Sequence, residues 1–225
     1  MGPIYALRRT AFCAGAFATG AVWYGFVIAL ICATPAGAQG LPSDIYGTHE
    51  IRAASSRLGQ KTTECSVGYR AMFRPTFRSD ARAVSVTGDF GVRLQAGNKS
   101  VGFLRLAVHD LVPGSSGLDS VPIRLRSIFV ATANGSTAGG RLAEEEMAPS
   151  GTVAATFAID DSLLAVLTDA INTARLTIFF RRPGIERDIA AELDLTVTAT
   201  EDGFRRVHSS SQIDAFSLCL SRLLA

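Results

Sequence analysis

The sequence is poor in histidine and lysine, and it lacks the motifs of the common enzyme classes. Its three histidines, His49, His109 and His208, lie far apart in the chain. It contains no G-x-S-x-G, S-x-x-K or P-loop motif, and no G-x-G-x-x-G that opens a helix after a strand. His49-Glu50 begins like a zinc-peptidase motif, but Ala53 stands where the second histidine is needed. The sequence therefore predicts no catalytic residue, no metal site and no cofactor.

A basic block is also missing, which excludes one class of partner. Of the 22 basic residues, Arg8 and Arg9 lie in an N-terminal segment without acids, so the others equal the 20 acidic residues in number. Nucleic-acid binding needs a clustered positive footprint, and we set it aside. The 48% hydrophobic content excludes intrinsic disorder, and 225 residues suffice for one ordinary domain.

The N-terminus has the features of a secretory signal over residues 1–38. Arg8-Arg9 is followed by an apolar run over 11–33 and by a small-residue cleavage site, Ala36-Gly37-Ala38, before Gln39. The alternative is an uncleaved anchor, because this run is long enough to span a bilayer. No other segment is long and apolar enough to span a bilayer. We therefore expect a periplasmic or secreted bacterial protein with no membrane span after cleavage. The choice between general and twin-arginine export stays open.

Four cysteines become two when the signal is removed. Cys13 and Cys32 leave with it, and Cys65 and Cys219 remain. Two cysteines in an oxidising compartment are most simply one disulfide. Its loop of about 155 residues corresponds to roughly 5 kcal/mol in the chain-entropy picture. The alternative is a catalytic or redox thiol, although neither cysteine belongs to a C-x-x-C pair.

Alternation of apolar and polar residues predicts a chain made mostly of short strands. Residues 39–62, which mix Gly, Ser, Pro and Ala with charges, are typical of an exposed leader or of a weak helix before the domain. Polar turns then separate the strand candidates. We expect strands at 65–73, 83–94 with a break near 88–89, 101–109, 121–132, 153–159, 175–180 and 189–198, followed by a polar loop at 199–210.

Two late segments predict helices. Asp160-Asp161 supplies an N-cap, and the last helix lies near the C-terminus with Cys219 beside its apolar stripe. Because strands and helices do not alternate, a doubly wound parallel sheet is improbable. We expect a mainly β, antiparallel β-sandwich-like (α+β) single domain over residues 63–225. The two apolar stripes comprise Leu163, Leu164, Leu167 and Ile171, and Ile213, Phe216, Leu220 and Leu223.

A few polar residues are candidates for ligand binding. His109-Asp110, at the end of a strand, is the best acid–base pair, although neighbouring residues of a strand point to opposite faces. Arg181-Arg182, and Arg205-Arg206 with His208, are candidates for binding an anion. The alternative is that these residues end a strand or keep a sheet edge soluble. The Glu144–Glu146 run is more typical of a solvated surface than of a cation site.

The last third of the chain carries a family resemblance. The segments Val153–Leu167, Leu176–Phe180 and Ile213–Leu220 resemble the C-terminal half of invasion-associated locus B proteins, which are small secreted alphaproteobacterial proteins. The shared pattern is a strand, a D-x-L-L helix, two strands and a closing helix. That family commonly has further cysteines in mid-chain, and none lies between Cys65 and Cys219 here. The resemblance implies a β-rich envelope protein linked to stress or host contact, without catalytic residues.

Export, one expected disulfide and a neutral domain together favour a non-enzymatic role. We expect an exported protein that binds another envelope or host component, with a protein as its partner. The alternative is a small-molecule-binding protein or a hydrolase that uses His109 in a pocket.

Overall fold

The computed structural model describes residues 45–75, 82–114, 117–138, 151–202 and 204–225. The expected signal peptide and the Glu144–Glu146 run lie outside these ranges. The elements are β1 (Gly47–Leu58), β2 (Lys61–Phe73), β3 (Val84–Leu94), a short 3-10 helix (Ala96–Asn98), β4 (Ser100–Gly114), β5 (Gly117–Pro122), β6 (Ser127–Ala131), β7 (Val153–Ala158), α1 (Asp161–Thr173), β8 (Arg175–Arg181), β9 (Ile189–Asp194), β10 (Val197–Glu201), β11 (Arg205–His208) and α2 (Ser211–Leu224).

The larger sheet is an antiparallel arrangement in the order β1-β2-β3-β4-β5, with β7 also paired to β4. The long strand β4 makes this possible because its two halves pair with different strands. Residues 101–106 pair with β7, and residues 109–114 pair with β5. The segment that follows β5 leaves this sheet, and the chain returns to it at β7.

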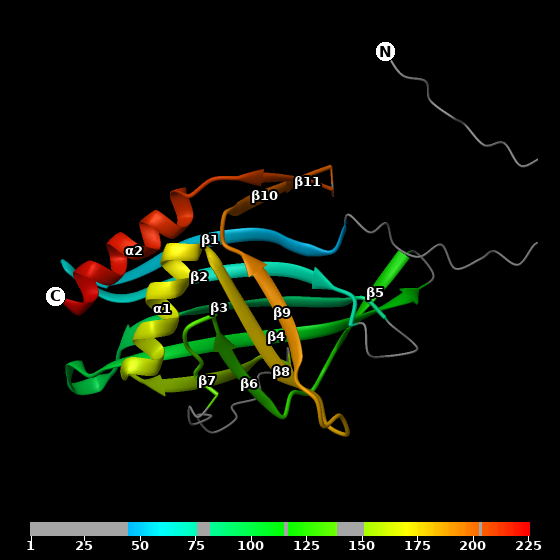
Figure 1. Cartoon of the computed structure of the whole chain (residues 1–225), viewed down its shortest axis with the longest axis horizontal. Coiled ribbons are helices and arrows are strands. Elements are labelled where there is room, and N and C mark those ends of the chain that lie inside the picture. Colours follow the sequence, from blue (N-terminus) through cyan, green and yellow to red (C-terminus); the bar gives the residue numbers. More distant parts are fainter. Residues whose placement is uncertain (1–44, 76–81, 115–116, 139–150, 203) are drawn as a thin grey trace, which may run out of the picture. The chain divides into compact units, whose positions relative to one another are not determined.

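The second layer is a smaller antiparallel sheet in the order β6-β8-β9, accompanied by both helices. Figure 1 shows these strands crossing the larger sheet, with α1 and α2 beside them and the β10–β11 hairpin above. Alternate residues of both sheets fill the space between them, among them Val86, Leu106, Ile178, Phe180 and Leu193. The predicted antiparallel β-sandwich-like (α+β) fold is confirmed, and the described residues form one compact unit.

The expected exposed leader at 39–62 is wrong from Gly47 onward. There β1 pairs with β2 along its whole length, and Ile51, opposite Tyr69, is completely buried. The residues near the tip of this hairpin, such as Ser56 and Arg57, are exposed. They supply no apolar alternation, so the strand has no signature in the sequence.

Three expected boundaries in the strands are also wrong. The segment 121–132 divides between β5 and β6, which belong to different sheets. Residues 189–198 form the end of one strand and the start of another, because β9 ends at Asp194. The expected loop at 199–210 contains most of the β10–β11 hairpin.

The expected break near 88–89 is absent, and Gly88 shows why a glycine lies inside β3. A Cβ on Gly88 would lie 2.0 Å from the Arg105 carbonyl oxygen and 2.7 Å from the Tyr69 hydroxyl. Glycine therefore permits close approach of the neighbouring strand and of a buried tyrosine at this position. The strand continues without interruption from Val84 to Leu94.

Both predicted helices are confirmed. Asp160 caps α1, because its side chain accepts a hydrogen bond from the Leu163 amide at 3.0 Å. Leu163 is completely buried, whereas Leu164, expected on the apolar stripe, is 40% exposed. In α2 the whole expected stripe is buried, and it comprises Ile213, Phe216, Leu220 and Leu223.

Gly102 in β4 determines how closely α1 approaches the larger sheet. A Cβ at this position would lie 2.5 Å from Leu163 Cδ2. We expect Gly102→Ala to lower the free energy of unfolding by about 1–3 kcal/mol through overpacking. Chemical denaturation measures this change. Gly68→Ala is the control, because its Cβ would meet only ordinary contacts of 3.6 Å or more; an equal loss in both variants would contradict this account.

Candidate functional site

The structure separates the two residues of the expected acid–base pair. Asp110 is 8% exposed, and its two oxygens accept hydrogen bonds from Arg182 at 3.0 and 2.7 Å. His109 lies on the opposite face of β4, because successive side chains of a strand alternate between faces. It pairs with Ser85 on one side and Pro122 on the other. His109 and Asp110 are therefore not brought together.

The arginines expected to bind an anion are engaged with groups of the protein itself. Arg181 donates to both oxygens of Asp188 at 2.8 and 3.0 Å, and Arg182 holds Asp110. Bidentate pairs of this kind combine charge with fixed geometry. An anionic ligand would have to displace these carboxylates, so the structure assigns both arginines a part in stability. Ligand binding by His109, Asp110, Arg181 and Arg182 stays a prediction.

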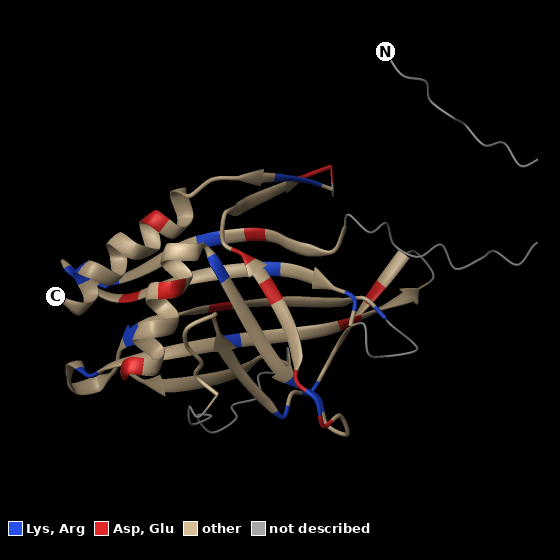
Figure 2. Ribbon diagram, viewed as in Figure 1, with Lys and Arg blue, Asp and Glu red and all other residues tan. Residues whose placement is uncertain are grey.

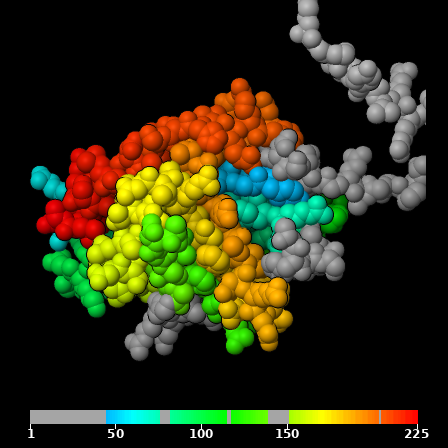
Figure 3. All heavy atoms as spheres, viewed as in Figure 1, coloured from blue at the N-terminus to red at the C-terminus, as the bar shows by residue number. Residues whose placement is uncertain are grey.

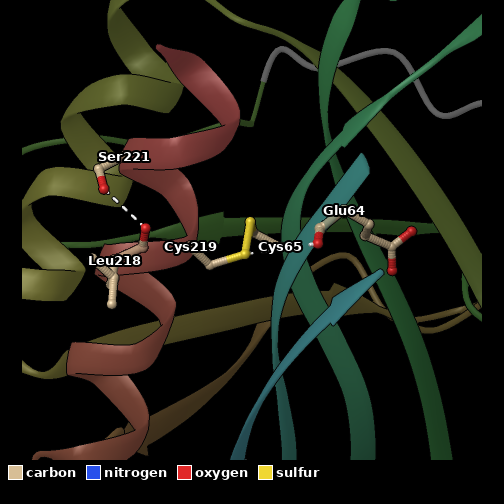
Figure 4. The surroundings of a disulfide bond; sticks show 5 residues. All are labelled: Glu64, Cys65, Leu218, Cys219 and Ser221. Carbon is tan, nitrogen blue, oxygen red and sulfur yellow. Dashed lines mark hydrogen bonds between the residues drawn. A yellow bond between two sulfur atoms is a disulfide. The ribbon is translucent and has the colours of Figure 1, made fainter. Parts of the chain in front are cut away.

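The predicted disulfide between Cys65 and Cys219 is present. It joins β2 to α2 across 154 residues of sequence, with 5.7 Å between the two Cα atoms. Figure 4 shows the bond between the helix and the strand, beside the Glu64 carbonyl and the Ser221–Leu218 hydrogen bond. Cys65 is completely buried, and Cys219 contacts the same core at its edge.

A cavity of about 660 Å³ lies where five parts of the fold meet. Its wall comes from the start of β1, the turn after β6, the end of α1, the β8–β9 pair and the β10–β11 hairpin. In Figure 3 the surfaces of α1 (yellow), β9 (orange) and β1 (blue) adjoin on the face shown. The volume of this cavity is in the range of small-molecule sites. The polar lining includes Tyr46, Thr48, Thr132, Asp169, Arg175, Glu192, Asp194, Arg206 and His208.

Sequence reasoning missed this cavity. Its residues come from segments far apart in the chain, and no motif joins them. The sequence indicates His208 only as a neighbour of Arg205-Arg206. Those two arginines are engaged as well: Arg205 pairs with Glu201, and Arg206 donates to the main-chain oxygens of Thr48, at 2.7 Å, and Tyr46.

Asp169, near the end of α1, is the most buried charged residue of the cavity, with 9% of its surface exposed. Its Oδ1 accepts a hydrogen bond from Asn134 Nδ2 at 2.9 Å. Within the described residues, its Oδ2 and the nearby Thr132 Oγ1 are buried without a hydrogen bond of ordinary geometry. The Thr132 hydroxyl nevertheless lowers the pKa of Asp169, with smaller contributions from Asn134 and Ala133. The carboxylate is therefore ionised at neutral pH.

A hydrogen-bond relay lies at the other side of the cavity. The Thr196 hydroxyl donates to Asp194 Oδ1 at 2.6 Å, and His208 Nδ1 lies 2.8 Å from the same hydroxyl. Because the Thr196 proton is committed to Asp194, a neutral His208 donates from Nδ1 and keeps Nε2 as an acceptor. The Thr196 amide also donates to Asp194. This relay stabilises the turn between β9 and β10.

Two other cavities formed by the described residues, of about 510 and 340 Å³, lie beside α1. His109 lines neither of them, nor the larger one. In the described ranges, no three His, Cys, Asp or Glu side chains are grouped to hold a metal ion. Nor do those ranges contain a helix with the length and apolar character of a bilayer span.

The lowered pKa of Asp169 predicts a dependence of stability on pH. Because the pKa is lower in the folded state, the carboxylate stabilises the fold above its unfolded pKa, near 3.9, and this stabilisation is lost as the pH falls further. We expect Asp169→Asn to be less stable than the parent at pH 7, with the difference shrinking below about pH 4. Urea denaturation across this pH range measures it, and a difference that is constant with pH would contradict the prediction.

Comparison of the chain with known proteins adds no further guide to function: no protein-family model, no curated protein and no solved structure matches it.

Proposed function

We propose that this is an exported, disulfide-stabilised protein that works without catalysis, by binding another envelope or host component. The observation that carries the proposal is the Cys65–Cys219 disulfide, which joins the last helix to the larger sheet. Such bonds persist in oxidising compartments and are rare in the cytosol of most organisms. The signal-like segment 1–38 favours the same compartment, the bacterial periplasm or the exterior.

The ion pairs formed by the polar candidate residues support a binding role rather than a catalytic one. Asp110 and Arg182 hold each other, and Arg181 holds Asp188. These two ion pairs connect different parts of the fold, which is a structural role rather than a catalytic one. The resemblance to invasion-associated locus B proteins supports a role in stress or host contact, and it favours a protein partner.

Charge supports a partner other than nucleic acid. Figure 2 shows basic and acidic residues interspersed along the described strands. Several of them neutralise each other, as Arg105 does with Asp89 and Glu64 on the open face of the larger sheet. A surface of this kind is a poor match for a phosphate backbone.

A small-molecule-binding protein is the second candidate, and the 660 Å³ cavity favours it. The variant of this idea in which His109 hydrolyses a substrate has less support, because His109 lines none of the three cavities.

Native mass spectrometry of the protein isolated from its own cell envelope tests the proposal. We expect a chain that begins at Gln39, is lighter by two hydrogens because of the disulfide, and carries a second protein. A bare monomer with a retained small molecule would favour the second candidate. A chain that keeps residues 1–38 and has free thiols would contradict export and the oxidised state together.

A further inference from the structure

We propose that Asn134 is a modification site, at which the folded protein loses the side-chain amide by spontaneous deamidation. This inference goes beyond the proposed binding role and does not depend on it. Asparagine is one of the chemically labile residues. A following glycine has no Cβ and leaves its own peptide nitrogen open to the asparagine side chain. Of the three asparagines in the sequence, only Asn134 is followed by glycine.

The fold itself requires a glycine after Asn134. The turn that follows β6 lies against α1, and a Cβ on Gly135 would be 3.0 Å from both the Ala165 Cβ and the Val166 nitrogen. The Thr132 amide donates to the Gly135 carbonyl at 2.9 Å and closes the turn. A larger residue would push this turn away from the helix. The packing therefore keeps the labile pair of residues together.

The nucleophile and the side chain that it attacks are both available in the folded turn. Asn134 is exposed, and Gly135 is half-buried. Within the described ranges, the Gly135 amide nitrogen has no hydrogen-bond acceptor, so no such contact restrains it. The leaving group is the Asn134 Nδ2, which donates to Asp169 Oδ1 at 2.9 Å. This hydrogen bond orients the side chain but does not engage the nucleophile.

The reaction consumes water and no other reactant. The Gly135 nitrogen forms a bond to Asn134 Cγ and gives up its proton, while the bond from Cγ to Nδ2 breaks and ammonia leaves with that proton. Water then adds to either carbonyl carbon of the five-membered cyclic imide and opens the ring. The product is an aspartate, or an isoaspartate whose main chain runs through the former side chain.

Deamidation replaces a hydrogen-bond donor by a second carboxylate beside Asp169. The Thr132 hydroxyl lowers the pKa of Asp169 most, and Asn134 and the Ala133 amide lower it further, so Asp169 is ionised at neutral pH. Two neighbouring carboxylates repel each other, and Asp169 loses a donor. The turn is then held less firmly on α1. Because Thr132, Ala133 and Asp169 line the 660 Å³ cavity, the wall of that cavity changes.

Peptide mass spectrometry of the purified, folded protein during incubation at mildly alkaline pH tests the reaction. We expect the peptide with Asn134 to gain the mass difference between an amide and a carboxyl group, and to separate into aspartate and isoaspartate forms. Asn98 and Asn172 are internal controls and should keep their amides, because larger residues follow them. Isoelectric focusing should show a new acidic form of the parent but not of Asn134→Gln, whose longer side chain would need a larger ring.

Thermal unfolding tests the consequence. Asn134→Asp is a homogeneous version of the aspartate product, and we expect its melting temperature at neutral pH to be about 3–6 °C below that of the parent. The difference should shrink below about pH 4, where both carboxyl groups take up protons. Asn98→Asp is the matched control, because Asn98 Oδ1 lies 3.0 Å from Lys61 Nζ. Its melting temperature should change by no more than about 2 °C.

The inference is wrong if Asn134 keeps its amide for as long as Asn98 and Asn172 do. It is also wrong if the amide is lost only when urea unfolds the chain, because the folded turn would then protect it. Equal melting temperatures of Asn134→Asp and Asn98→Asp would contradict the repulsion from Asp169. None of these measurements depends on export or on a partner, so their failure is distinguishable from failure of the proposed function.

Discussion

Loss of the Cys65–Cys219 disulfide is expected to lower the free energy of unfolding by about 2–5 kcal/mol. The bond spans 154 residues, so opening it releases most of the unfolded chain from a constraint. It also frees α2, whose stripe of Ile213, Phe216 and Leu220 covers the larger sheet. Urea denaturation of the Cys65→Ala/Cys219→Ala double variant measures the loss.

Reduction supplies the control for this prediction. The parent protein in dithiothreitol should lose as much stability as the double variant, and the double variant should not respond to the reductant. If reduction left the parent's unfolding midpoint unchanged, the helix would be held by its apolar contacts alone. The disulfide would then contribute little to the stability of the fold.

Local chemistry explains which parts of this fold were predictable. The cap at Asp160 and the stripes of both helices are encoded in adjacent residues, so their signals survive without tertiary context. Val153–Ala158 and Arg175–Arg181 alternate regularly because each has one face in the core. The disulfide was predictable because two cysteines remain after the expected cleavage.

The missed elements depend on contacts distant in sequence. The first strand, β1, is held by pairing with β2 and by the Thr200 hydroxyl, which donates to the His49 carbonyl, rather than by an alternating pattern of its own. The segment β5 is exposed at every position, so it has no buried face to reveal it. Ile123 and Leu125 are buried in the connection after β5, and their alternate spacing in the sequence resembles that of a strand.

The same reasoning applies to the candidate site. Asp169, Glu192 and His208 converge only after α1, β9 and β11 are in place, so no spacing in the sequence joins them. Ion pairs between residues far apart in the chain were equally unpredictable from the sequence. The sequence placed Asp110 and Arg182 each at the end of an expected strand, which is wrong for Asp110 because β4 continues to Gly114. Their contact across 72 residues was not predictable from either neighbourhood.

Breaking the Asp110–Arg182 pair is expected to cost about 3 kcal/mol, at the lower end of the range for buried ion pairs. Their side chains are only 12% and 15% exposed, and removing either one leaves the other charge without a partner in a largely dry site. The pair joins β4 of the larger sheet to the end of β8 of the smaller sheet. It therefore stabilises the contact between the two layers.

A double-mutant cycle separates this structural role from the ligand-binding alternative. Arg182→Ala and Asp110→Ala should each be strongly destabilising, while the double variant costs clearly less than their sum, because no unpaired charge remains. Arg181→Ala is the adjacent control: the Arg181–Asp188 pair is 34% and 26% exposed, so its loss should cost about 1 kcal/mol or less. If Arg182→Ala were as mild as Arg181→Ala, the structural role of Arg182 would be contradicted and the ligand-binding alternative would gain support.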